Sequence, residues 1–161
     1  MVSKTILVLI LAGFSAGFCM SQQTTTKSEF LNYQTGIGVE TFYQSNYGLA
    51  LGGLIGKNIG QKSKPNYAIG IYADAILVNS PIVGPRAKLS YNYLGIFGLN
   101  LNFSNYFRNG LNDFRITPEV NFTLFGVGSI FAGYSLKVSK DNFSEINEFR
   151  LGLNLGLVNR K

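Results

Sequence analysis

Large apolar residues alternate with small or polar residues over 148–158, near the end of the chain. The odd positions from Phe149 to Leu157 are all large and apolar, whereas the even positions from Glu148 to Gly156 are charged, amide or glycine residues. A period of two is that of a β-strand with two different faces. Lys, Glu and Thr, which are usual on the outside of a soluble sheet, are scarce on the second face. We therefore interpret the apolar face as turned to lipid and the small polar face as turned into a narrow barrel lumen.

Seven further stretches alternate in the same way, and turn-rich segments separate them. These stretches are 35–43, 47–55, 67–77, 86–93, 96–104, 114–124 and 129–138. Eight strands of about 9 to 11 residues are what a minimal transmembrane barrel requires. The predicted fold is therefore all-β, an eight-stranded antiparallel up-and-down transmembrane β-barrel over residues 35–158.

Glycine, proline and asparagine residues predict where the strands end or are distorted. We expect the segment 79–85, with two prolines and a glycine, to stop a strand, and the pair Gly52-Gly53 to hold a bulge. Asn109-Gly110 is a strong turn signal inside a predicted loop over 105–113. Pro118 is a misfit within its strand because it lacks a backbone donor.

The first 21 residues resemble a cleaved secretory signal, with Lys4 before an apolar core and a run of mostly small residues. Lipid attachment at Cys19 is the alternative. Residues 22–34 are predicted to form a polar lead-in, and 159–161 a short tail. If the signal is removed, the single cysteine goes with it, which leaves no disulfide or thiol chemistry.

The lengths of the connections between strands predict which end of the barrel faces outward, except for the first two connections. If both chain ends are periplasmic, the first, third, fifth and seventh connections face outward and are expected to be long. The first is short, however, and the second is a long basic loop with Lys57, Lys62 and Lys64. This lysine cluster is either a contact for lipid phosphate groups or a solvated loop.

Candidate chemistry is limited by composition. The chain has no histidine, which excludes a histidine-based catalytic triad, metal site or pH switch, and we expect no enzymatic activity, metal or cofactor. Mild basicity, with a net charge of +6, suits a neighbourhood of anionic lipid, and no nucleic-acid partner is expected.

Charged residues nevertheless fall on the inward face, where they must be paired or wetted. We interpret them as an ion-pair network that fills the lumen, with a small ion path or polar ligand site as the alternative. They are Glu40, Asp74, Arg86, Lys88, Arg115, Glu119, Lys137 and Arg150. Aromatic residues near strand ends, such as Tyr43, Tyr47, Tyr67 and Tyr91, are typical of the two interfacial girdles of a membrane barrel.

Together these features resemble the small OmpA/OmpX-type outer-membrane barrels of Gram-negative bacteria. Such barrels end on a polar residue, a glycine and two alternate hydrophobic residues, and Arg150, Gly152, Leu155 and Leu157 match that spacing. A final aromatic residue is usual, whereas this chain continues to Lys161. The resemblance implies an outer-membrane location, with outer-membrane lipid and the barrel assembly machinery as partners.

The function expected from this resemblance is a structural or surface-interaction role, in envelope integrity or adhesion, through the outward loops and a loop-binding partner. Three alternatives stay open. They are a narrow pore for ions or small solutes, a soluble lipocalin-like carrier with the alternation turned inside out, and a barrel-borne lipid enzyme.

Overall fold

The computed structural model describes residues 33–59, 64–124, 128–139 and 143–158, which form β-strands joined by turns and connections. The strands are β1 (Tyr33–Tyr43), β2 (Tyr47–Lys57), β3 (Asn66–Ile76), β4 (Ile82–Tyr93), β5 (Phe97–Arg108), β6 (Leu111–Leu124), β7 (Gly128–Tyr134), β8 (Leu136–Lys137) and β9 (Phe149–Val158). The predicted signal peptide, the C-terminal tail and all of the lead-in before Tyr33 lie outside the described residues. Among the described residues, no helix is long and apolar enough to cross a membrane.

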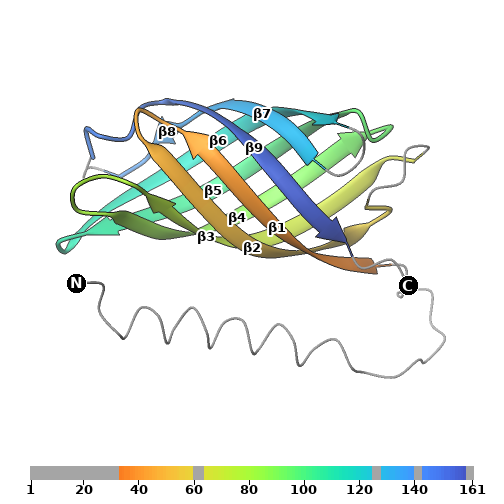
Figure 1. Cartoon of the computed structure of the whole chain (residues 1–161), viewed down its shortest axis with the longest axis horizontal. Coiled ribbons are helices and arrows are strands. Elements are labelled where there is room, and N and C mark those ends of the chain that lie inside the picture. Colours follow the sequence, from red (N-terminus) through yellow and green to blue (C-terminus); the bar gives the residue numbers. More distant parts are fainter. Residues whose placement is uncertain (1–32, 60–63, 125–127, 140–142, 159–161) are drawn as a thin grey trace, which may run out of the picture. The chain divides into compact units, whose positions relative to one another are not determined.

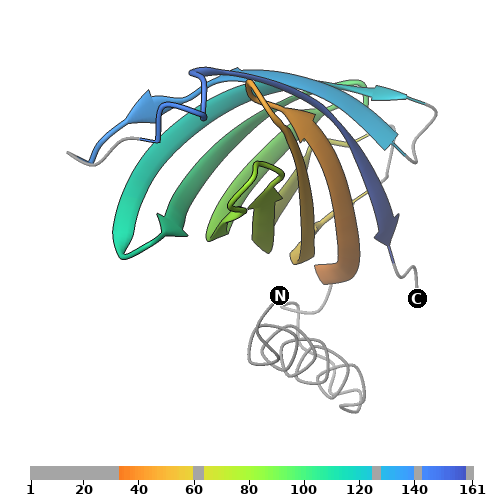
Figure 2. The ribbon, with the colours of Figure 1, turned by 60° about the vertical axis from the view of Figure 1, so that its left-hand side comes forward.

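All neighbouring strands pair antiparallel, and pairing of β5 with β6 closes the sheet into a barrel (Figure 1, Figure 2). β7 and β8 together make one barrel strand, because both pair with β6 in a single register, Glu119 with Gly133 and Arg115 with Lys137. The prediction of an all-β, closed, eight-stranded antiparallel barrel is therefore confirmed.

The pairing register fixes the width of the barrel. A path that starts at Tyr33 on β1 and passes from each residue to its partner on the next strand returns to β1 at Tyr43. The residues on this path are Lys57, Tyr67, Tyr91, Leu99, Val120, Ala132 and Leu151. The path closes ten residues further along β1, so the strands are steeply tilted. With strands about 4.8 Å apart and a rise of about 3.3 Å per residue, this stagger gives a tilt of roughly 40° and a backbone radius of roughly 8 Å. Inward side chains from opposite walls therefore meet near the axis.

The barrel has two different ends. The turns 44–46, 77–81 and 109–110 and the connection from β8 to β9 lie at one end, here called the loop end. β1 begins and β9 finishes at the other, the terminal end. β1 and β2 pair over all their residues without an offset, so the bulge predicted at Gly52-Gly53 is wrong. The same pairing confirms both early strands, and the long basic connection after β2 therefore lies at the terminal end.

The loop predicted over 105–113 is a hairpin instead. β5 continues to Arg108 and β6 starts at Leu111, so the connection is a two-residue turn. Asn109 and Gly110 have φ angles of 52° and 80°, a left-handed conformation that these two residue types adopt readily. The polar residues of 105–113 look like loop residues in the sequence, but here they continue the ladder.

Both prolines within the strands interrupt pairing on one side only. The predicted interruption over 79–85 does end β3, at Ile76, but it is shorter than expected, because β4 already begins at Ile82 and includes Pro85. Pro85 pairs with Ala73 of β3, whereas its side toward β5 has a gap in the ladder. Pro118 pairs with Leu101 of β5, and the opposite ladder breaks where Ser135 separates β7 from β8. A missing N–H removes the bond to one neighbouring strand and leaves the other intact.

The barrel is apolar outside and charged inside. Ile71 and Leu157, on the outer face, expose 72% and 79% of their surface, whereas Arg86 and Arg115, on the inner face, expose 0%. Alternation produces this arrangement because successive side chains of a strand point to opposite faces. It is the reverse of a water-soluble domain, where charged residues are almost never fully buried unless they are paired.

Candidate functional site

Eight charged side chains are buried inside the described part of the barrel, four acidic and four basic. They are Glu40, Asp74, Arg86, Lys88, Asp113, Arg115, Glu119 and Arg150. Alternation predicts all of them except Asp113, which the sequence places in a loop. It also predicts Lys137, which the structure leaves exposed on β8 although its register position is opposite Arg115. The charges of the buried set therefore balance, which matters because an unpaired buried charge is costly.

Arg86 on β4 lies at the centre of this set. Its Nε donates to Asp74 Oδ1 at 3.0 Å, its Nη2 to Glu40 Oε2 at 2.5 Å and its Nη1 to Asn102 Oδ1 at 3.0 Å. Lys88, on the same inward face of β4, donates to the other oxygen of Glu40 at 2.6 Å. Each Glu40 oxygen therefore binds a separate cation, and such charge-assisted bonds are about twice as strong as neutral ones.

Arg150 on β9 lies among three carboxylates without a close hydrogen bond to any of them. Its guanidinium nitrogens come within 3.6 Å of Glu40, 3.6 Å of Asp74 and 3.5 Å of Glu119. Its Cζ lies 3.9 Å from the ring centroid of Phe42, and its Nε and Nη2 have no hydrogen-bond partner within the described part of the chain. Arg150 is thus held by charge and by a cation–π contact, with donors left for water.

Inward glycines make room for aromatic rings that cross the lumen. A Cβ atom added at Gly38 would meet the Tyr72 hydroxyl at 2.5 Å, and one added at Gly70 would meet the Tyr72 ring at 2.7 Å. The Cζ of Phe131 would lie 2.5 Å from a Cβ atom at Gly152. Alternation puts Tyr72 on the inward face of its strand, but it does not predict that Tyr72 and Phe131 fill the lumen; the signal available for this was glycine at facing positions of neighbouring strands.

A second ion pair lies nearer the loop end. Arg115 Nη2 donates to Asp113 Oδ2 at 2.7 Å, and its Nη1 donates to the carbonyl of Ile146 at 3.0 Å. Asp113 also accepts the backbone N–H of Phe143 at 3.1 Å. Phe143 and Ile146 expose only 1% and 2% of their surface. We call residues 143–147 the cap segment, because buried polar groups of the barrel hold its backbone.

The rim of the loop end holds the cap segment from other strands as well. Gln44 Nε2 donates to the carbonyl of Asn147 at 2.6 Å, and Asn46 Nδ2 to the carbonyl of Glu145 at 2.8 Å. Arg108, at the end of β5, pairs with the carboxylate of Glu145 at 2.8 Å. The hydrogen bond from Arg108 holds the pKa of Glu145 below its ordinary value. The turn between β1 and β2 and the end of β5 therefore both bind this segment.

The remaining candidate residues lie apart from the charge network, except for Arg150. Of the predicted assembly residues, Arg150 and Gly152 face the lumen, whereas Leu155 and Leu157 face outward. Lys57 and Lys64 are exposed at the terminal end, and Lys62 lies outside the described residues. Within the ranges that the structure describes, no three His, Cys, Asp or Glu side chains are grouped so that they would hold a metal ion.

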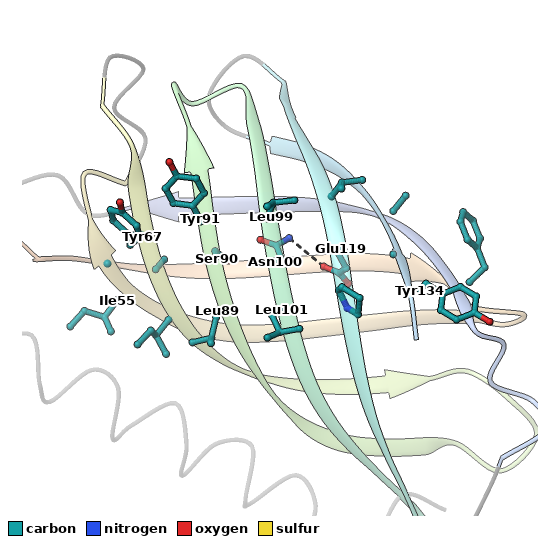
Figure 3. A pocket seen from close by; sticks show the side chains of 18 of the residues that line it. Ile55, Tyr67, Leu89, Ser90, Tyr91, Leu99, Asn100, Leu101, Glu119 and Tyr134 are labelled. Carbon is teal, nitrogen blue, oxygen red and sulfur yellow. Dashed lines mark hydrogen bonds between the residues drawn. The ribbon is translucent and has the colours of Figure 1, made fainter. Parts of the chain in front are cut away.

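A shallow apolar groove of about 1050 Å³ runs across the outer surface. Figure 3 shows Tyr67, Tyr91 and Leu99 along one side and Leu89 and Leu101 along the other. Each side is a row of outward residues that follows the pairing register from strand to strand. The groove is the space between two such rows, and the polar residues along its floor, Ser90, Asn100 and Glu119, belong to the inward face of their strands, where Asn100 donates to Glu119.

Fold and lumen together define a closed β-barrel with an apolar exterior and a paired, charge-neutral interior. Comparisons of the sequence with protein-family models and with curated proteins find no match.

Proposed function

We propose that this chain is a transmembrane barrel of a Gram-negative outer membrane, with a structural or surface-interaction role carried by its loop end. The observation that carries the proposal is the inverted surface, in which outward aliphatic and aromatic residues surround buried ion pairs. In water this band of outward apolar residues would be a large exposed apolar patch. In a membrane the same band faces lipid chains, which is favourable.

The dimensions of this band support this location. Tyr33 and Tyr43 stand ten residues apart at the two ends of β1. At about 3.3 Å per residue and a tilt of roughly 40°, they are separated by about 25 Å along the barrel axis, which is the height of the apolar band of outer-membrane barrels. Paired aromatic rings mark both margins, with Tyr43 next to Tyr47 at the loop end and Tyr67 next to Tyr91 at the terminal end.

The interior argues against a wide or open pore. Ion pairs cross the lumen at Glu40, Asp74 and Arg86, and the cap segment is bonded over the loop end. A soluble lipocalin-like carrier has the same type of fold, but its cavity needs an apolar lining. Here most large apolar residues are on the outer face, and the lumen holds ion pairs beside its buried apolar side chains, which favours the membrane protein over the carrier.

The loop end is suited to contacts with a partner because its hairpin is exposed and well ordered by pairing. Phe107 and Leu111 expose 43% and 51% of their surface beside the Asn109-Gly110 turn. An epitope inserted between Asn109 and Gly110 is expected to be labelled on intact cells. Labelling that requires opening of the outer membrane would reverse the proposed orientation.

The membrane location is tested by two substitutions at positions of equal exposure. Ile71, at the middle of β3, and Tyr47, at the loop-end start of β2, each expose 72% of their surface. In a lipid-embedded barrel Ile71→Arg costs about 2–4 kcal/mol, because it lies near the bilayer midplane, whereas Tyr47→Arg costs about 0–1 kcal/mol near the interface. In a soluble protein both are ordinary surface changes.

Heat-modifiability provides the first measurement. The folded chain, extracted only with detergent, is expected to migrate faster on SDS gels before boiling than after. The two arginine variants are then unfolded in lipid vesicles with urea, and the fraction folded is read from the same gels. Extraction without detergent, or equal stability of the two variants, would rule out the lipid-facing assignment.

A further inference from the structure

The lumen is divided into two unlike halves. Between the terminal end and the ion pairs, the described inward residues are small or neutral, such as Gln34, Ser129, Asn154 and Gly156. From Glu40 toward the loop end, charged and aromatic side chains fill the interior. The tilt and register place these groups at different heights, so the uncharged half extends inward from the terminal end only.

Solvent reaches the uncharged half. Ser90, Ser129 and Asn154 face inward and are only half-buried, whereas Ser104 and Ser135, which face inward nearer the loop end, each expose only 1% of their surface. A Cβ atom added at Gly156 would meet no atom within 4 Å, so there is open space beside this strand.

Acceptor atoms without a hydrogen-bond partner among the described residues belong to inward residues of this half. Oxygens of Gln34, Asn121 and Asn154 are buried and have no hydrogen-bond partner in the part of the chain that the structure describes. Glu119 Oε1, at the inner end, accepts no hydrogen bond from the described residues either, although Arg150 Nε lies 3.5 Å away. Buried acceptors of this kind are normally satisfied by water or by a ligand that donates hydrogen bonds. An uncharged ligand that donates hydrogen bonds fits these acceptors best, because the buried charges nearby already balance one another.

The inner end of this space is blocked by an aromatic and cationic layer. Tyr72 and Phe131 are buried across the lumen, exposing 3% and 1% of their surface. Lys88 Nζ lies 5.7 Å from the Tyr72 ring centroid and 5.6 Å from that of Phe131, and it also bonds Glu40. The ion pairs and the cap segment follow behind this layer.

From these observations we propose that the terminal half of the lumen is a blind, uncharged vestibule. It takes up water and small neutral molecules that donate hydrogen bonds, such as amides and polyols, and it ends at Tyr72, Phe131 and Lys88. This goes beyond the structural role proposed above, and it depends on the barrel interior rather than on the membrane location.

Single cysteines test the vestibule, because Cys19 is the only cysteine of the chain and Cys19→Ser removes it. Ser129→Cys and Ser135→Cys are a matched pair, since both residues face inward on the same barrel strand, one half-buried and one buried. Ser90→Cys and Ser104→Cys repeat the comparison on neighbouring strands in case one variant fails to fold. Iodoacetamide, itself a small neutral amide, is the probe, and folding is verified for each variant by heat-modifiability.

In the folded full-length chain, iodoacetamide is expected to modify Ser129→Cys at least about tenfold faster than Ser135→Cys, because a buried thiol reacts only when the structure opens locally. Boiling is expected to abolish the difference. Equally slow modification of both thiols would mean that the terminal half is closed, and equally fast modification would mean that the lumen is open throughout. Either result overturns the vestibule, and neither depends on whether the barrel lies in lipid.

Discussion

Removing the charge of Glu40 is the most informative change in the lumen. This fully buried carboxylate bonds Arg86 at 2.5 Å and Lys88 at 2.6 Å, and Arg150 lies at 3.6 Å. Glu40→Gln keeps the size of the side chain but leaves an excess buried positive charge. Breaking a buried pair from one side costs about 3–5 kcal/mol, because the remaining partner is desolvated without compensation.

The assay is urea unfolding of the barrel in detergent micelles or vesicles, followed by circular dichroism and gel mobility, since the chain has no tryptophan. With a urea dependence of about 2 kcal/mol per molar, a loss of about 4 kcal/mol lowers the unfolding midpoint by about 2 M. Glu145→Gln is the matched control, because Glu145 pairs with Arg108 at the partly exposed rim. Its midpoint is expected to stay close to that of the parent chain.

A second substitution separates charge imbalance from loss of packing. Lys88→Met in the Glu40→Gln background restores the charge balance, so the double variant is expected to be more stable than Glu40→Gln alone. A double-mutant cycle then measures the coupling between the two residues. If Glu40→Gln unfolds at the same urea concentration as Glu145→Gln, the interior is wetter than its burial implies and the argument from charge balance is wrong.

Three further outcomes are expected. Gly48→Ala should destabilise the barrel by about 1–3 kcal/mol, because its methyl group overlaps an aromatic ring, whereas Gly156→Ala, with nothing within 4 Å, should leave the urea midpoint unchanged. Gly110→Ala should cost about 1 kcal/mol in the same assay, because φ there is 80°. The lowered pKa of Glu145 means that its bond to Arg108 stabilises the cap segment above the ordinary carboxyl pKa of 4.5 and is lost as the pH falls through the lowered value. On acidification, the protection factors of cap-segment amides, corrected for the intrinsic exchange rate at each pH, should then fall in the parent chain but not in Glu145→Gln.

Alternation predicted most of the barrel because a strand must send successive side chains to opposite faces. It gave the number of barrel strands, their order and the inward position of residues such as Arg86 and Arg150. It failed where polarity was taken as evidence of a loop, at 105–113, and where Pro85 was expected to lie before its strand rather than within it. Both errors have one cause, since pairing with a neighbouring strand overrides the local preference of a residue.

By itself, then, the sequence determined the class of fold and which face of each strand is charged, because both follow from a period of two that each strand carries locally. Only the tertiary structure decided which charges meet. The stagger of ten residues around the barrel brings Glu40 of β1 to Arg86 of β4 and Arg150 of β9, a match that no spacing along the chain encodes. The tertiary structure also buries Asp113 and leaves Lys137 exposed, the reverse of what the sequence predicts, and it places the cap segment over the loop end. These positions depend on where the strands end relative to one another.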